Sequence, residues 1–221
     1  MSSPRYQSRV MVEFARGYVK ICGVTTLGDA NAVIDAGATG IGLIFAASPR
    51  QLSLERAMAI CAATKGRALR TAVFRNNDNT FILNALDVVD VEIVQIHGPL
   101  DGELLKRLRQ RGVAIVKALP IESDEFYDFD ESTVDAVMID NAEPGSGRTH
   151  SWDELTERSF SVPVIAAGGL NADNVASIIA LTGAWGVDTA SGVESSPGVK
   201  DRDEVRAFVD SARTAYATEM T

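Results

Sequence analysis

Two side chains suited to proton transfer stand at the ends of apolar segments that are far apart in the chain. Cys22 closes YVKIC at residues 18–22, and Asp140 closes AVMID at residues 136–140. A thiolate can remove a proton and a carboxylic acid can supply one, so these residue types suit general acid–base catalysis. Each also has a structural alternative, since a free cysteine packs as a small hydrophobic residue and an aspartate can cap a turn or helix. The residue types alone leave these alternatives open.

Lys20 lies two residues before Cys22, so the two side chains share a face if this segment is a strand. A nearby ammonium favours the thiolate, and we expect Lys20 to lower the pKa of Cys22. Cys61 offers a contrast, because it lies in SLERAMAICAATKG at residues 53–66, a segment with helical spacing of apolar residues. We expect Cys61 only to pack.

Further polar residues stand where other apolar segments end. Arg50 follows a Ser-Pro pair, and a guanidinium in such a loop can hold a carboxylate as a two-pronged partner. Gln95 and His97 end VEIVQIH and could line a site. His97 could equally satisfy a backbone carbonyl, and this alternative is slightly favoured.

Two glycine-rich segments, AAGGLNADNV at 166–175 and ASGVESSPGVKD at 190–201, could hold a phosphate. Glycine allows the backbone to approach an anion closely, and backbone N–H groups at the start of a helix bind it. We expect a short helix that begins near Ser196 or Pro197, although two ordinary turns are the alternative. The candidate phosphate-binding residues are Gly168, Gly169, Ser191 and Gly192.

Eight β-rich segments alternate with amphipathic helical patterns, and they must bring these residues together. They span residues 18–22, 40–45, 68–74, 91–96, 113–119, 136–140, 162–168 and 185–191. In repeated strand–helix units the strands pair in parallel, which predicts an α/β fold. Eight such units predict a single-domain (β/α)₈ TIM barrel over residues 18–217. In this fold the functional site lies at the carboxyl ends of the strands. Residues 1–17 are expected to be a loosely ordered extension. A doubly wound parallel sheet is the alternative, but G-x-G-x-x-G is absent after the first strand.

The amino-acid composition limits the kinds of partner that the chain can bind. The 21 basic and 30 acidic residues give a net charge of −9, which disfavours binding to nucleic acid or to a membrane surface. No segment resembles a secretory signal or a membrane span, and two cysteines indicate a reducing, cytoplasmic setting. The two histidines are far apart in sequence, so we expect no metal site.

Seven segments, in this order, resemble the phosphoribosylanthranilate isomerase family of tryptophan biosynthesis. They are KICGVT at 20–25, SPR at 48–50, VQIHG at 94–98, ID at 139–140, PGSGRTHSW at 144–152, AGGL at 167–170 and SGVESSPGVKD at 191–201. The resemblance spans about residues 18–210 and implies a (β/α)₈ barrel that acts without a cofactor. The implied reaction is the Amadori rearrangement of N-(5-phosphoribosyl)anthranilate to 1-(2-carboxyphenylamino)-1-deoxyribulose 5-phosphate.

The same resemblance implies roles for individual residues. Cys22 would be the general base, Asp140 the general acid and Arg50 the partner of the anthranilate carboxylate, while the amides of the two glycine-rich segments would hold the phosphate. The partner would be a small phosphosugar substrate, and the chain a monomer or weak homodimer. Pro144, His150 and Gln51 depart from the family pattern, which puts loop stiffness and packing around anthranilate in question.

Two other functions are alternatives to this isomerase activity. The histidine-pathway isomerase performs the same rearrangement on a larger substrate with two phosphates, but its family has a carboxylate where Cys22 stands. A phosphate-ligand binding protein that has lost catalysis is the other alternative, and the presence of both Cys22 and Asp140 speaks against it.

Overall fold

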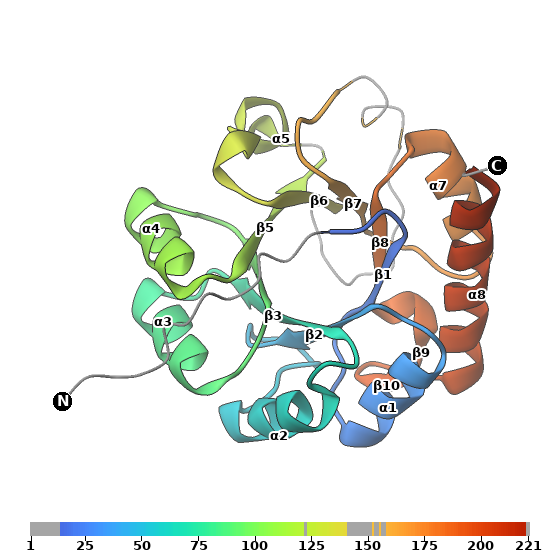
Figure 1. Ribbon diagram of the computed structural model, residues 1–221, viewed down its shortest axis with the longest axis horizontal. Helices are drawn as coiled ribbons and strands as arrows, with labels where there is room; N and C mark the ends of the chain where they lie inside the picture. The colour runs from blue at the N-terminus through green and yellow to red at the C-terminus, as the bar shows by residue number, and fades with distance from the viewer. Residues whose placement is uncertain (1–13, 122, 141–151, 153–154, 156–157, 220–221) are drawn as a thin grey trace.

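The computed structural model describes residues 14–121, 123–140, 152, 155 and 158–219. Eight parallel strands form a closed barrel in chain order, and helices surround it (Figure 1). The strands are β1 (Tyr18–Ile21), β2 (Gly40–Ile44), β3 (Leu69–Arg75), β4 (Ile93–His97), β5 (Ala114–Pro120), β6 (Ala136–Asp140), β7 (Val164–Ala166) and β8 (Gly186–Thr189). Because β1 pairs with β8, the predicted barrel is confirmed and the doubly wound sheet is wrong.

The helices of the described residues alternate with the strands, as the sequence pattern predicts. They are α1 (Leu27–Asp35), α2 (Leu54–Thr64), α3 (Asn79–Val88), α4 (Gly102–Arg111), α5 (Asp124–Asp128), α7 (Val175–Thr182) and α8 (Arg202–Glu219). Short polar side chains cap three of them: Thr26, Ser53 and Asp101 start α1, α2 and α4, and each accepts a hydrogen bond from a backbone N–H in the first turn. At Gly112 and Gly183 the backbone is left-handed, which ends α4 and α7.

Side-chain alternation divides the strands into an inner and an outer set. Ile93, Val116 and Met138 belong to one buried cluster inside the barrel, whereas Ile115 and Val137, one residue away, belong to the larger cluster under the helices. Parallel strands covered on both faces are apolar at nearly every position, which explains the near-continuous hydrophobic runs. Polar side chains in the inner set therefore stand out against an apolar background.

The amino end of the barrel is closed by residues just before β1. Phe14 is buried and lies edge-to-face with Tyr18 at 5.5 Å between ring centroids. The backbone carbonyl of Phe14 accepts a hydrogen bond from the indole of Trp185. Phe14 thus packs against the barrel; residues 1–13 lie outside the described part, and the loosely ordered extension over residues 1–17 stays a prediction.

The segment after β8 differs from the prediction. No helix begins near Ser196 or Pro197; instead β9 (Glu194–Ser196) and β10 (Val199–Lys200) form an antiparallel hairpin, preceded by a 3₁₀ turn at Ser191–Val193. Gly198 has φ of 84°, a left-handed conformation that turns the chain back. The predicted short helix is therefore wrong, and α8 begins only at Arg202.

None of the helices in the described ranges is both long enough and apolar enough to span a bilayer.

Candidate active site

Cys22 directly follows β1, at the carboxyl end of the barrel. Its N–H donates to the carbonyl of Thr189 at 2.7 Å, which continues the pairing with β8 past the end of the strand. A β-carbon at Gly42 on the neighbouring strand would lie 2.7 Å from the Cys22 sulfur, so glycine is required there. Cys22 thus lies on the inner face of the barrel, and it is 6% exposed.

Lys20 lies below Cys22 on the same inner face and is paired with an acid. Its Nζ lies 2.8 Å from Oδ1 of Asp188, which stands directly opposite on β8, and both residues are buried. Burial raises the pKa of Cys22, and the attraction to the Lys20 ammonium opposes this without reversing it. Lys20 therefore acts in the expected direction, but the net pKa is not lowered, because desolvation of the thiolate outweighs one cation and the negative charge of Asp188 raises the pKa further.

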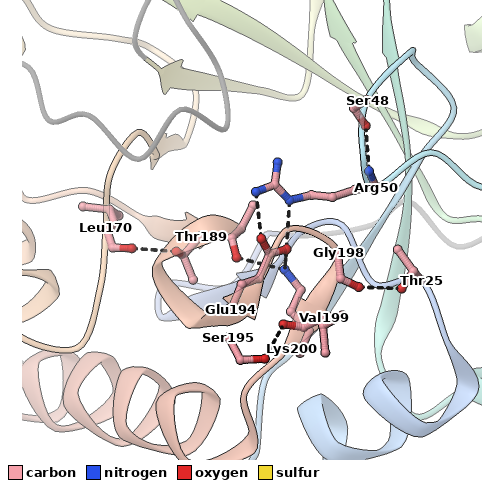
Figure 2. A network of polar contacts seen from close by, with 11 residues as sticks. Thr25, Ser48, Arg50, Leu170, Thr189, Glu194, Ser195, Gly198, Val199 and Lys200 are labelled. Carbon is pink, nitrogen blue, oxygen red and sulfur yellow. Dashed lines mark hydrogen bonds and ion pairs between the residues drawn. The ribbon is translucent and has the colours of Figure 1, made fainter.

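Arg50 occupies the mouth of the barrel beside Cys22, where it is held by an acid. Its Nε and Nη2 donate to the two carboxylate oxygens of Glu194 at 2.8 and 2.7 Å, as Figure 2 shows. Lys200 reaches the same carboxylate at 2.8 Å and also donates to the carbonyl of Ala190 at 2.9 Å. The predicted carboxylate-binding arginine is thus already engaged by a carboxylate of its own chain.

These contacts set the charge of the cluster. Burial raises the pKa of Glu194, but hydrogen bonds from Arg50 and Lys200 outweigh burial and leave that pKa below its ordinary value. Burial lowers the pKa of Lys200, although Glu194 counteracts it. With one carboxylate facing two cations, the mouth of the barrel has a positive balance when all three groups are ionised, which suits an anionic ligand.

Asp140 ends β6 at the same end of the barrel and is 7% exposed. Since Ala136 and Met138 belong to the inner cluster, alternation puts Asp140 on the inner face as well. Its backbone carbonyl accepts from Ile121 at 3.0 Å. The two candidate proton-transfer residues therefore share both a face and an end of the barrel.

Gln95 and His97 line the inner face of β4. Their side-chain Nε2 atoms lie 2.7 Å apart. Burial, with a smaller contribution from the nearby cations Lys20, Lys117 and Arg75, lowers the pKa of His97 to about 3. A neutral His97 ring nitrogen can therefore accept from the Gln95 amide, which is a side-chain partner rather than the backbone carbonyl favoured from the sequence.

The two glycine-rich loops meet after β7 and β8. Gly168 and Gly169 have φ of 91° and 71°, left-handed conformations that turn the chain after β7. A β-carbon at Gly192 would lie 1.9 Å from the carbonyl oxygen of Leu170, so the two loops touch backbone to backbone. Thr189 donates its hydroxyl to the same carbonyl at 2.6 Å and joins the loops a second time. The loop after β7 is thus held against the end of β8 and the loop that follows it.

Three residues of this region were missed from the sequence: Asp188, Glu194 and Lys200. An acid inside the apolar strand segment WGVDTAS was a signal for Asp188. Glu194 and Lys200 flank SSPGV, whose Pro-Gly pair is typical of a turn between two strands, and a hairpin brings its flanks together. Pro144 and His150 lie outside the described residues, and Gln51 is exposed, donating to the Phe45 carbonyl at 3.1 Å.

Within the described ranges, no cluster of three or more His, Cys, Asp or Glu residues is placed to hold a metal ion. Lys117, a buried cation of β5, lies on the outer face and pairs with Glu125 at 2.7 Å.

Fold and site together define a (β/α)₈-barrel protein with a thiol, a carboxyl group and cationic groups at the carboxyl ends of its strands, the end where such barrels act as enzymes. Comparisons with known proteins narrow this class. The family model of N-(5'-phosphoribosyl)anthranilate isomerase matches residues 19–211. The chain belongs to this family.

Relatives agree in sequence and in structure. The N-(5'-phosphoribosyl)anthranilate isomerase of Rhodopseudomonas palustris is 34% identical over 210 residues, which cover 89% of this chain and 96% of the relative. The phosphoribosylanthranilate isomerase structure from Thermotoga maritima has a TM-score of 0.80 at 31% identity, covering 89% of this chain and 98% of that one. A further isomerase structure, in complex with reduced 1-(o-carboxyphenylamino)-1-deoxyribulose 5-phosphate, has a TM-score of 0.75 at 29% identity, with coverage of 89% and 98%.

Proposed function

We propose that this chain converts N-(5-phosphoribosyl)anthranilate to 1-(2-carboxyphenylamino)-1-deoxyribulose 5-phosphate in tryptophan biosynthesis, with Cys22 as general base and Asp140 as general acid. Membership of the isomerase family supports the reaction. The observation that carries the residue roles is that Cys22 and Asp140 stand on the inner face at the same end of one closed barrel. A relative that binds a reduced form of the product supports the ligand class.

The chemistry needs one acid and one base. Asp140 donates a proton to the ring oxygen of the aminosugar, the bond from that oxygen to C1 breaks, and the anthranilate nitrogen lone pair forms an iminium with C1. The iminium acidifies the C2 hydrogen, and the Cys22 thiolate removes it to give an enolamine. The enolamine then loses the proton of its C2 hydroxyl and gains one at C1, which gives the ketone product.

The rest of the site would bind the two ends of the substrate. Arg50 would hold the anthranilate carboxylate, and the amides around Gly168, Gly169, Ser191 and Gly192 would hold the phosphate. Fixing both ends aligns the reacting atoms with the acid and the base, and such alignment can supply several kcal/mol, with a ceiling of about 7–11 kcal/mol. Lys20, Gln95 and His97 would line the inner wall.

A direct assay tests the proposal. Freshly generated N-(5-phosphoribosyl)anthranilate is added to the purified chain, and we expect its anthranilate fluorescence to decay much faster than in buffer. The histidine-pathway substrate is assayed alongside and is expected to react far more slowly. Binding of the first substrate without turnover would instead favour the binding protein, and a faster reaction of the second would favour the histidine-pathway isomerase.

A further inference from the structure

The guanidinium of Arg50 is held along one edge only. Glu194 occupies the edge formed by Nε and Nη2. Figure 2 shows the third nitrogen turned away from Glu194, and within the described residues Nη1 has no hydrogen-bond partner. A guanidinium has five N–H donors in a fixed plane, so one carboxylate on this edge leaves the donors of Nη1 for a second anion.

The position of Glu194 is itself fixed from several sides. Both Glu194 and Lys200 have side chains that are almost fully buried, at 3% and 0% exposure. The turn of their hairpin is attached to the loop after β1, because Thr25 donates to the carbonyl of Gly198 at 2.7 Å. Glu194 therefore presents its carboxylate to Arg50 from a rigid element rather than from a free loop.

The stem of Arg50 is equally constrained. A β-carbon at Gly23 would lie 2.5 Å from the Cδ atom of Arg50, so the stem crosses the backbone directly beside Cys22. Gly23 has φ of 70°, a conformation that glycine adopts without strain. The absence of a side chain at Gly23 thus lets the Arg50 stem lie beside the proposed base. Glu194 fixes the orientation of the Arg50 guanidinium.

We propose that Glu194 is a positioning residue for substrate recognition: it holds Arg50 by the Nε/Nη2 edge so that Nη1 faces the carboxylate of the anthranilate ring. This inference rests on the proposed function. Glu194 does not compete for the substrate's binding edge, and it also keeps Lys200 beside Arg50 by sharing one carboxylate oxygen between them.

Two matched ligands separate this role from general structural damage. One is reduced 1-(2-carboxyphenylamino)-1-deoxyribulose 5-phosphate, and the other is the same compound without the ring carboxylate. We expect Glu194→Gln to lower the affinity for the carboxylated ligand by about tenfold and the affinity for the other ligand by less than about twofold, because the variant loses the charge that orients Arg50. Glu194→Asp keeps the negative charge on a shorter side chain, and its affinity for the carboxylated ligand is expected to lie between those of the wild type and Glu194→Gln.

Glu92 provides a matched control. It holds Arg70 by the same Nε/Nη2 edge, at the amino end of the barrel and away from the mouth. Glu92→Gln should leave the affinity for both ligands within about twofold of wild type. Combined with Arg50→Ala, Glu194→Gln should cost little further affinity for the carboxylated ligand, because the two residues act through one contact.

Three results would overturn the inference: unchanged or tighter binding of the carboxylated ligand in Glu194→Gln, equal weakening of both ligands, or additive losses in the double variant. Because these are binding measurements, they decide the role of Glu194 independently of turnover. A wild-type chain that binds the carboxylated ligand but does not isomerise the substrate would contradict the proposed function instead.

Discussion

The two ends of the barrel each contain a group made of a cysteine, an arginine and a glutamate. We call Cys22, Arg50 and Glu194 the carboxyl-end cluster and Cys61, Arg70 and Glu92 the amino-end cluster. Both arginines are bound along the Nε/Nη2 edge by their glutamate. Burial raises the pKa of both cysteines, that of Cys61 to about 12. Residue types and the geometry of the arginine–glutamate pair therefore do not distinguish the two clusters.

The clusters differ in what remains available to a ligand. In the amino-end cluster Arg70 also donates Nη1 to the carbonyl of Cys61 at 2.8 Å, so all three nitrogens bind the chain itself. In the carboxyl-end cluster Nη1 of Arg50 is bound to no described residue, and the thiol faces the barrel interior. A saturated set of donors stabilises the fold, whereas a set with one unused donor can also recognise a ligand.

The largest expected effect is the loss of Cys22. Cys22→Ala should lower kcat by about 10²–10⁴-fold, the usual contribution of a general base, while affinity for the reduced product stays within a few fold. The measurement is initial rate by anthranilate fluorescence, with equilibrium binding of the reduced product in parallel. A kcat close to that of wild type would show that another group removes the C2 proton.

Loss of the acid should be comparably damaging. Asp140→Asn keeps the shape of the side chain but cannot donate an acidic proton to the ring oxygen, and kcat should fall by about 10²–10⁴-fold. Asp135→Asn is the matched control: Asp135 directly precedes the same strand at its other end, where it accepts from the backbone N–H of Ile115 at 2.7 Å and pairs with Arg109. If Asp140→Asn and Asp135→Asn retain equal activity, the acid assignment is wrong.

The pH dependence of alkylation at Cys22 should follow the ionisation of its thiol, whereas kcat/KM also depends on the proton that Asp140 must keep. Because burial raises this pKa and the thiolate is the nucleophile, the rate of reaction with iodoacetamide should climb about tenfold per pH unit through neutrality and level off only above the ordinary thiol value of about 9.0. The charged and titratable groups that act on this thiol are Lys20, Tyr18, Asp188, Lys200 and Arg50. Alkylation rates of the Cys61→Ala variant between pH 6 and 10 measure this limb at Cys22, and a midpoint below about 7 would contradict the raised pKa.

The smallest effect on activity is expected for Cys61. Cys61→Ala should leave kcat and its pH profile unchanged and lower the free energy of unfolding by about 1–2 kcal/mol through the cavity it leaves. Since the folded-state pKa of Cys61 lies at about 12, above the ordinary 9.0, its contribution to stability is present below pH 9 and is lost as pH rises toward 12. The free energy of unfolding, measured in urea at several alkaline pH values, should therefore fall less steeply with pH in the variant than in the wild type. A steeper fall in the variant would contradict this pKa.

Much of the fold and part of the site could be predicted from sequence because the signals were local. Alternating strands and helices specified eight βα units, and the barrel architecture then placed Cys22 and Asp140 at the functional end. The packing role expected for Cys61 agrees with its buried position in α2. The short helix near Ser196 failed because the contacts that keep that segment extended come from Arg50, more than a hundred residues away.

The sequence by itself determined the order of the elements and the chemical groups at their ends. These depend on the spacing of hydrophobic residues, on helix caps and on turn residues, each of which acts only on residues nearby in the chain. The tertiary structure alone decided the electrostatics: that Lys20 is paired with Asp188, that burial raises the Cys22 pKa, and that Glu194 holds Arg50 by one edge. Charge interactions and desolvation depend on distance and enclosure in space. Residues from opposite ends of the chain meet only when the barrel closes.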